Sequence, residues 1–332
     1  LGLYFLFRLF FGRKDGAAAT MKRAALFAGA VILAVALGLV QLLPSYRFTT
    51  AQSVRSGEAR TSYEYATSWS MHPEEVMGML IPSFPGFDLG PQFYWGRNHF
   101  KLNSEYNGIL PIVFAIAALA AVRRRQTWFF LGLGALALIY ALGATTPIYR
   151  LFYSLVPGVK NFRAPGMIIF LFTFAVASMS AIFLSALFDR KITDEITGRK
   201  YLYAAGGVFL FAAAVSIMGR SFFDLWNGFF YRGIEQDRLE IMARNIPNVT
   251  ADLWRAASLS VAALVGVWLF LSRKLSSMSL GLLLSVIMVI DTAAVNSRFI
   301  TVIDPDTYSG LVPDQSVTDI RAKMNESPPF GE

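Results

Sequence analysis

The sequence contains no cysteine and only two histidines among its 332 residues. The absence of cysteine excludes a disulfide framework, a thiolate metal site and a cysteine nucleophile. Two histidines are too few for a histidine-based metal cluster. Charged residues are also scarce, at 16%, while hydrophobic residues make up 55% of the chain. The composition therefore favours one integral-membrane domain over several soluble ones, and it specifies no metal.

Seven long apolar runs predict membrane-spanning helices, because most are close to the roughly 17 to 25 residues that cross a bilayer. An eighth run, residues 1–12, predicts part of a further helix, as expected for a piece of a longer protein. Since lipid offers the backbone no hydrogen bonds, we expect an all-α, polytopic transmembrane helical bundle over residues 1–295. The seven runs cover residues 24–43, 108–122, 127–144, 165–188, 201–218, 256–272 and 275–295.

The basic residues predict the orientation of this bundle. Thirteen of the 30 Lys and Arg residues, but only four of the 22 acidic residues, lie on alternate connections between the runs. These connections carry a net charge of +9, which accounts for the whole excess of +8. The pattern is the positive-inside signal of a membrane protein and not the footprint of a nucleic-acid partner. We therefore expect residues 45–107, 145–164 and 219–255 to face the outer side, with residues 296–332 opening an outer soluble segment.

The first outer loop holds four of the predicted catalytic residues. His72 and Pro73 precede Glu74 and Glu75 in a stretch that predicts a short helix over residues 73–80. Carboxylates at such a helix start can cap it and interact favourably with its dipole, so structural roles explain both glutamates. The functional alternative makes Glu64, Glu74 and Glu75 acid/base or metal-orienting groups, with His72 as an accessory.

Aromatic residues crowd the same loop. An interfacial belt that anchors the loop to lipid headgroups explains them most simply. The sharper alternative is a platform for a carbohydrate or polyprenyl ligand, to which Trp69, Tyr94 and Trp95 would contribute. The third outer loop mixes apolar and charged residues as an in-plane amphipathic helix does.

Two further sites carry charge at positions of interest. Arg163 lies just before the run 165–188, where its guanidinium and main-chain N–H groups are suited to a phosphate, with Lys160 behind it. The bland alternative is contact with lipid headgroups. Asp291 is an acidic residue within an apolar run, which predicts a partner or a wet cavity. Structural pairing with an outer arginine such as Arg298 is the favoured explanation for Asp291, ahead of a direct chemical role.

The ordered motifs of the chain resemble the YfhO-like bacterial membrane proteins, which are placed among glycosyltransferases of the GT-C architecture. The resemblance runs over nearly the whole chain and rests on the succession of motifs rather than on any one of them. The motifs are QLLP at 41–44, YEYATSWS at 63–70, PEE at 73–75, PSFPG at 82–86, YWG at 94–96, YNG at 106–108, FRAP at 162–165, ID at 290–291 and NSRF at 296–299.

The resemblance implies an enzyme of the bacterial cytoplasmic membrane that moves a sugar from a polyprenyl-phosphate carrier to an acceptor on the outer face. It implies an acidic residue that activates the acceptor or orients the donor, and basic residues that hold the carrier phosphate. The acid usually assigned lies upstream of this chain, which places the activity of this chain alone in question. Membrane lipids, the polyprenyl-linked sugar and other membrane subunits are the implied partners.

Two other classes of function remain open at this stage. A transporter or lipid flippase would favour ionisable residues or broken helices near the membrane midplane, with matching interruptions in two halves. Only Asp291 approaches that pattern, and it lies off centre. A non-catalytic assembly or scaffold subunit would keep the fold and bind a partner through its outer loops. Sensitivity of sugar transfer to a single outer-loop acid separates an enzyme from a scaffold.

Overall fold

The computed structural model describes residues 2–11, 16–51, 62–86, 94–98, 104–122, 124–189, 195–231, 233–300 and 315–326. Within these ranges the chain is all helical and contains no strand, as the sequence predicts. The α-helices are α1 Gly2–Phe11, α2 Ala17–Ala51, α3 Tyr63–Thr67, α4 Pro73–Gly78, α5 Ile109–Ala121, α6 Arg125–Ala141, α7 Tyr149–Leu155, α8 Phe170–Phe188, α9 Glu195–Met218, α10 Arg220–Phe230, α11 Gln236–Leu271, α12 Ser277–Asn296 and α13 Gln315–Glu326. Short 3-10 turns are η2 Gly143–Thr145, η3 Val159–Asn161, η4 Pro165–Ile169 and η5 Ser297–Phe299.

Four helices in the described ranges are long and apolar enough to cross a membrane, fewer than the seven spans expected. Helix α5 has 13 residues, and a rise of 1.5 Å per residue makes it only about 20 Å long, short of a hydrocarbon core of about 30 Å. A fifth span arises if a bent pair is counted as one unit. The long apolar helices are consistent with a multi-pass membrane protein. The four are Ala18–Phe48, Pro165–Phe188, Gln236–Leu271 and Ser277–Phe299.

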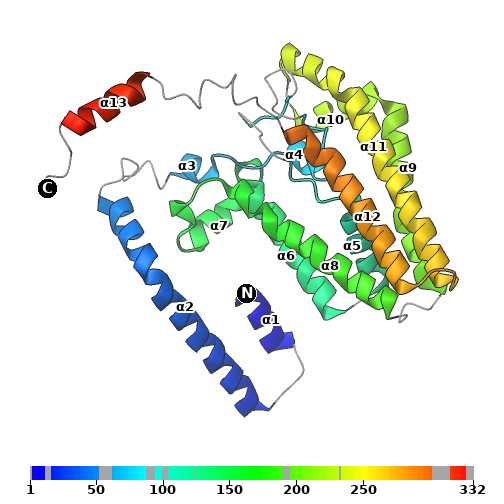
Figure 1. Ribbon diagram of the computed structural model, residues 1–332, viewed down its shortest axis with the longest axis horizontal. Helices are drawn as coiled ribbons and strands as arrows, with labels where there is room; N and C mark the ends of the chain where they lie inside the picture. Colours follow the sequence, from blue (N-terminus) through cyan, green and yellow to red (C-terminus); the bar gives the residue numbers. More distant parts are fainter. Residues whose placement is uncertain are drawn as a thin grey trace.

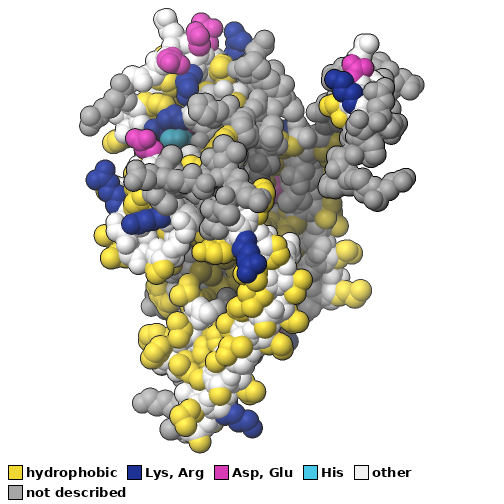
Figure 2. All heavy atoms as spheres, turned by 90° about the vertical axis from the view of Figure 1, so that its left-hand side faces the viewer, with side chains coloured by type: hydrophobic (Ala, Val, Ile, Leu, Met, Phe, Trp, Pro, Cys, Tyr) yellow, Lys and Arg dark blue, Asp and Glu magenta, His cyan; other side chains and the backbone are white. Residues whose placement is uncertain are grey.

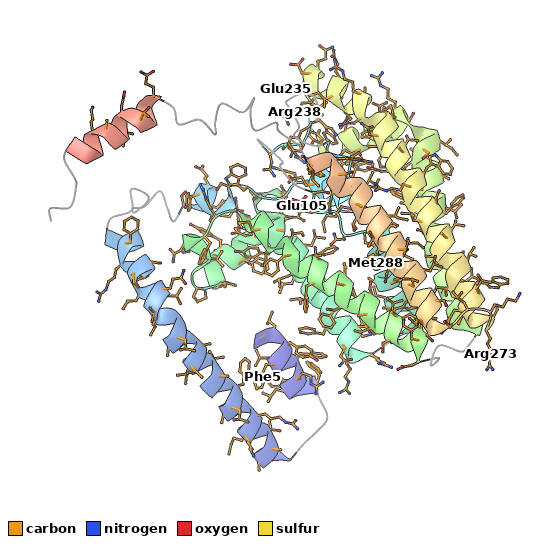
Figure 3. The ribbon with its side chains drawn as sticks, viewed as in Figure 1. Phe5, Glu105, Glu235, Arg238, Arg273 and Met288 are labelled. Carbon is orange, nitrogen blue, oxygen red and sulfur yellow. The ribbon has the colours of Figure 1, made fainter. Side chains whose placement is uncertain are left out.

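The helices form a bundle with two unlike ends (Figure 1). One end, called here the loop end, carries α3, α4, α7 and α10. The C-terminal ends of α5, α8 and α11 lie at the opposite end, where Figure 3 shows Arg273. On the face drawn in Figure 2, hydrophobic side chains cover a broad band, and most charged side chains gather above it. The basic connections of the predicted orientation fall partly on residues 12–15, 123 and 190–194, which lie outside the described residues.

The core joins α5, α8, α11 and α12. Phe114 of α5 stacks on Phe183 of α8, with ring centroids 5.5 Å apart. Small residues let the helices approach closely: a Cβ added at Gly266 of α11 would crowd the side chain of Leu283 on α12. Helix α2 lies apart from this core, and its apolar segment is not buried against other helices.

The start of α11 differs from the sequence prediction. The run 256–272 is only the second half of α11, which begins at Gln236 inside the expected outer loop. Its first half is polar on one face and packs Met242 and Val249 into a second cluster with Phe223 of α10. Helix α10 leaves the line of the preceding helix at 95°, with Gly219 at φ +50° at the break. That turn gives α10 the separate direction expected for an in-plane amphipathic segment.

Candidate functional site

The loop end contains an open cavity of about 850 Å³ between the 69–106 region and the start of α8, called here the loop-end pocket. Its walls combine aromatic, acidic, amide, hydroxyl and basic side chains on one side with apolar residues on the other. Figure 3 shows Glu105 at this end of the bundle. The lining residues are Trp69, Met71, Glu75, Asn98, Ser104, Glu105, Tyr106, Arg163, Ala164, Gly166, Met167, Ile169, Phe170 and Thr173.

Two residues with positive φ line the loop-end pocket from adjacent segments. Trp69 and Ala164 have φ values of +64° and +62°. These values lie in the left-handed region, which is unfavourable for any residue that has a Cβ atom. The Ala164 N–H donates to the Ser68 carbonyl at 3.0 Å, which ties the two strained segments together. A Cβ added at Gly166 would lie 3.0 Å from the Trp69 carbonyl oxygen, so glycine allows this approach. The surrounding contacts thus stabilise an unfavourable backbone conformation at Trp69 and Ala164, and such conformations are frequent at functional sites.

Helix α6 anchors the Trp69 segment from below. The Met71 N–H donates to the Ala141 carbonyl at 2.8 Å, and the Ala144 N–H donates to the Ser70 hydroxyl at 2.9 Å. Gly143 has φ +48°, and a Cβ there would overlap the Ser70 hydroxyl. The Trp69 side of the pocket is therefore fixed to α6 and to the turn that follows it.

Glu75 lines the pocket and acts as a structural acceptor. Its carboxylate accepts the His72 N–H at 2.8 Å, which caps the start of α4 as the sequence analysis allowed. It also accepts the Asn98 amide at 2.8 Å and the Tyr94 hydroxyl at 3.4 Å. These donors orient the carboxylate toward its own loop. Tyr94 contributes by this hydrogen bond, and burial is the first cause of the raised pKa of its hydroxyl.

Glu74 is fully buried beside the pocket and is committed to Arg97. Its carboxylate accepts the Arg97 N–H at 3.0 Å, Nε at 3.1 Å and Nη2 at 2.9 Å. Burial alone would raise the pKa of Glu74, but the hydrogen bonds and charge of Arg97 outweigh it and lower the pKa. The Arg97 guanidinium lies 4.4 Å from the Tyr231 ring centre. Arg97 therefore links Glu74 of α4 to Tyr231, which directly follows α10. Glu74 does not line the loop-end pocket.

His72 is half-buried, and Trp95 is fully buried. Burial is the main reason why the pKa of His72 lies below its ordinary value. Trp95 is 0% exposed, donates its indole N–H to the Phe84 carbonyl at 2.6 Å, and meets the Phe84 ring edge-on. The structure thus places Trp95 in the core and not on a binding platform, and of the three predicted platform aromatics only Trp69 lines the pocket.

The two predicted phosphate-binding cations lie in different places. Arg163 is exposed and lines the loop-end pocket, with its guanidinium 5.9 Å from the Tyr65 ring centre. Lys160 is exposed too, but it lines a separate 320 Å³ concavity over α7 and lies 5.2 Å from the Tyr153 ring centre. Glu64 is exposed on α3 and lines neither cavity. Arg163, Glu75 and Trp69 are therefore the predicted site residues that one pocket brings together.

Asp291 is 1% exposed and pairs with Arg255, which takes the place expected for Arg298. Arg298 instead pairs with Asp252 at 2.9 Å. The correction has a simple cause: α11 begins 20 residues earlier than the apolar run, so Arg255 belongs to a membrane helix packed against α12. Sequence reasoning also missed Glu105 and Thr173 as pocket residues, because Glu105 lies just outside the YNG motif and Thr173 lies inside the apolar run 165–188.

The described residues contain no group of three or more His, Asp or Glu side chains placed to hold a metal ion. No family model matches the chain, and no curated protein or solved structure is significantly similar to it.

Proposed function

We propose that the chain is a YfhO-like, GT-C-type glycosyltransferase that moves a sugar from a polyprenyl-phosphate carrier to an acceptor on the outer face of the bacterial cytoplasmic membrane. The observation that carries this proposal is the composition of the loop-end pocket. One wall offers carboxylate, amide and hydroxyl groups, the rim offers Arg163, and the η4–α8 wall offers the exposed apolar residues Met167 and Phe170. An amphiphile with a hydroxyl-rich, anionic head meets each of these surfaces with matching chemistry.

The proposed roles follow from what each group can do. Arg163 holds the carrier phosphate, since a guanidinium forms charge-assisted and bidentate bonds with phosphate oxygens. Its bond would stabilise the charge that develops on the leaving phosphate. Glu75 orients sugar hydroxyl groups, because three donors already fix its carboxylate. Glu105 is assigned as the general base toward the acceptor hydroxyl.

The test compares two exposed cations on one stretch of chain. Arg163→Gln should weaken binding of a polyprenyl-phosphate sugar about tenfold or more, the equivalent of one lost hydrogen bond between charged groups. Lys160→Gln is the matched control, because Lys160 lines the other concavity, and it should bind like wild type. Glu105→Gln should retain binding and lose transfer. Equal affinity of both glutamine variants, or no saturable binding by the full-length protein, contradicts the proposal.

A non-catalytic assembly subunit is the second candidate function. It is favoured by the way that Glu74 and Glu75 are used, since both carboxylates stabilise the fold of the first outer loop. A scaffold would keep sugar transfer in its partner complex when Glu105 and Glu75 are both changed to glutamine. Loss of transfer in Glu105→Gln alone, with binding retained, supports the enzyme.

A further inference from the structure

Four charged residues of alternating sign form a largely buried chain at the loop end, in which the aspartates are buried and the two arginine side chains are partly exposed. Arg298 Nη2 lies 2.9 Å from Asp252 Oδ1, and Arg255 Nη1 lies 3.3 Å from the same oxygen. Arg255 Nε lies 3.3 Å from Asp291 Oδ1. Both aspartates are almost fully buried, at 2% and 1% exposure. Two positive and two negative charges balance, so the chain can stay ionised inside the protein.

Asp291 connects this chain to the segment that enters α5. Its carboxylate accepts the Tyr106 hydroxyl at 2.8 Å and the Ile109 N–H at 2.9 Å. Gly108 precedes α5 at φ +80° and has no side chain to cap the helix, so Asp291 supplies the cap from α12. The Asp291 carboxylate therefore fixes both the first residue of α5, Ile109, and the side chain of Tyr106, three residues before it.

Tyr106 is the point at which the chain reaches the pocket. It lines the loop-end pocket, and its ring centre lies 5.6 Å from the Arg255 guanidinium carbon. Burial is the first cause of its raised pKa, with the charge of Asp291 second, so the phenol stays protonated. Because the Tyr106 hydroxyl donates its hydrogen bond to Asp291, its oxygen can only accept a hydrogen bond from a ligand.

We infer that Asp291 and Arg255 are positioning residues for the loop-end pocket, acting through Tyr106. Asp291 accepts a hydrogen bond from the Tyr106 hydroxyl. Arg255 pairs with the Asp291 carboxylate and lies beside the Tyr106 ring, so it holds both in place. Tyr106 then adds a fixed acceptor to a wall that already carries Glu75 and Glu105, and such a wall selects a ligand rich in hydroxyl groups. The identity of the ligand rests on the proposed function, whereas the positioning of the wall does not.

The natural absence of cysteine allows a direct test of the wall. Thr173→Cys places a thiol in the loop-end pocket, and Ser154→Cys places one in the concavity over α7. Each full-length protein is reconstituted in nanodiscs and labelled with a small charged methanethiosulfonate. In the Thr173→Cys background, Tyr106→Phe and Arg255→Met should change the labelling rate about tenfold, as expected for loss of a bond to a charged group. The rate at Ser154→Cys should stay constant.

Arg244→Met is the matched control, because Arg244 lies on α11 in an exposed pair with Glu240 and should leave both labelling rates unchanged. Tyr106→Phe keeps the ring, the hydrogen bond from the Ile109 N–H to Asp291 and the ion pair with Arg255, so it tests the inference even if Arg255→Met does not fold. Unchanged labelling in folded Tyr106→Phe overturns the inference. Protection of the thiol by a polyprenyl-phosphate sugar tests the ligand separately: a lack of protection with altered rates contradicts the proposed function and leaves the positioning intact.

Discussion

Neutralising Asp291 should destabilise the protein far more than neutralising a surface acid. In Asp291→Asn the shape is kept and the charge is lost. The variant amide oxygen can still accept from Tyr106 or Ile109, but the buried chain then holds two arginines and only Asp252. The perturbation therefore leaves one positive charge uncompensated at a site that is 1% exposed.

The expected loss in unfolding free energy is about 3–5 kcal/mol, the cost of removing one partner from a buried ion pair. Arg255→Met should cost a similar amount, because it removes the arginine that pairs with Asp291 and leaves Asp252 paired with Arg298 alone. The double variant removes one charge of each sign and restores the balance. Its loss should be smaller than the sum of the single losses by about 1–3 kcal/mol, the coupling typical of residues in one network.

The assay is reversible unfolding of the full-length protein in mixed micelles, followed by far-ultraviolet circular dichroism across a denaturing detergent series. All three variants and the exposed control Arg244→Met are compared at one pH and one ionic strength. A loss below about 1 kcal/mol in Asp291→Asn, the level of a surface pair, refutes a buried ionised chain. Strict additivity of the two single variants refutes the coupling.

Two further predictions concern the first outer loop, and a third concerns the turn after α6 that packs against it. The pKa of Glu74 lies below its ordinary 4.5 in the folded state, so its ionised carboxylate stabilises the fold fully above about pH 4.5 and this stabilisation is lost as the pH falls. In Glu74→Gln, the free energy of unfolding should therefore decrease less on acidification than in wild type. His72 has a pKa below 6.5, so folding favours its neutral form, and stability should fall as the pH drops below 6.5 in wild type but less in His72→Gln. Gly143→Ala should lower the unfolding free energy by at least about 1 kcal/mol, since φ +48° disfavours a Cβ and the Ser70 hydroxyl occupies its place.

Apolar runs predicted the positions of the helices well but not all their lengths. The run 108–122 corresponds closely to α5 Ile109–Ala121, because Gly108 breaks the helix and Arg124 follows its end. The start of α11 was missed because its first turns are charged and amphipathic, and hydropathy alone does not mark such a segment as the beginning of a span. Pro73 marked the start of α4 correctly, since proline fits the first helical position.

The candidate site was only partly within reach of the sequence. Local chemistry identified Arg163, Glu75 and Trp69, and the pocket brings them together. The sequence did not show that the Glu74 carboxylate binds Arg97, because the two residues lie 23 positions apart and meet only through tertiary packing. Arg255 was equally hidden, since its partner Asp291 lies on another helix. Long-range pairing of this kind follows from the packing of whole helices and leaves no periodic signal in the chain.

A cryo-EM map of the full-length protein incubated with a polyprenyl-phosphate sugar tests the central claim most directly. The account predicts density for the carrier phosphate at Arg163, with the sugar in the loop-end pocket between Tyr106, Glu75 and Glu105. An empty pocket, or carrier found only among the lipids that surround the helices, contradicts it.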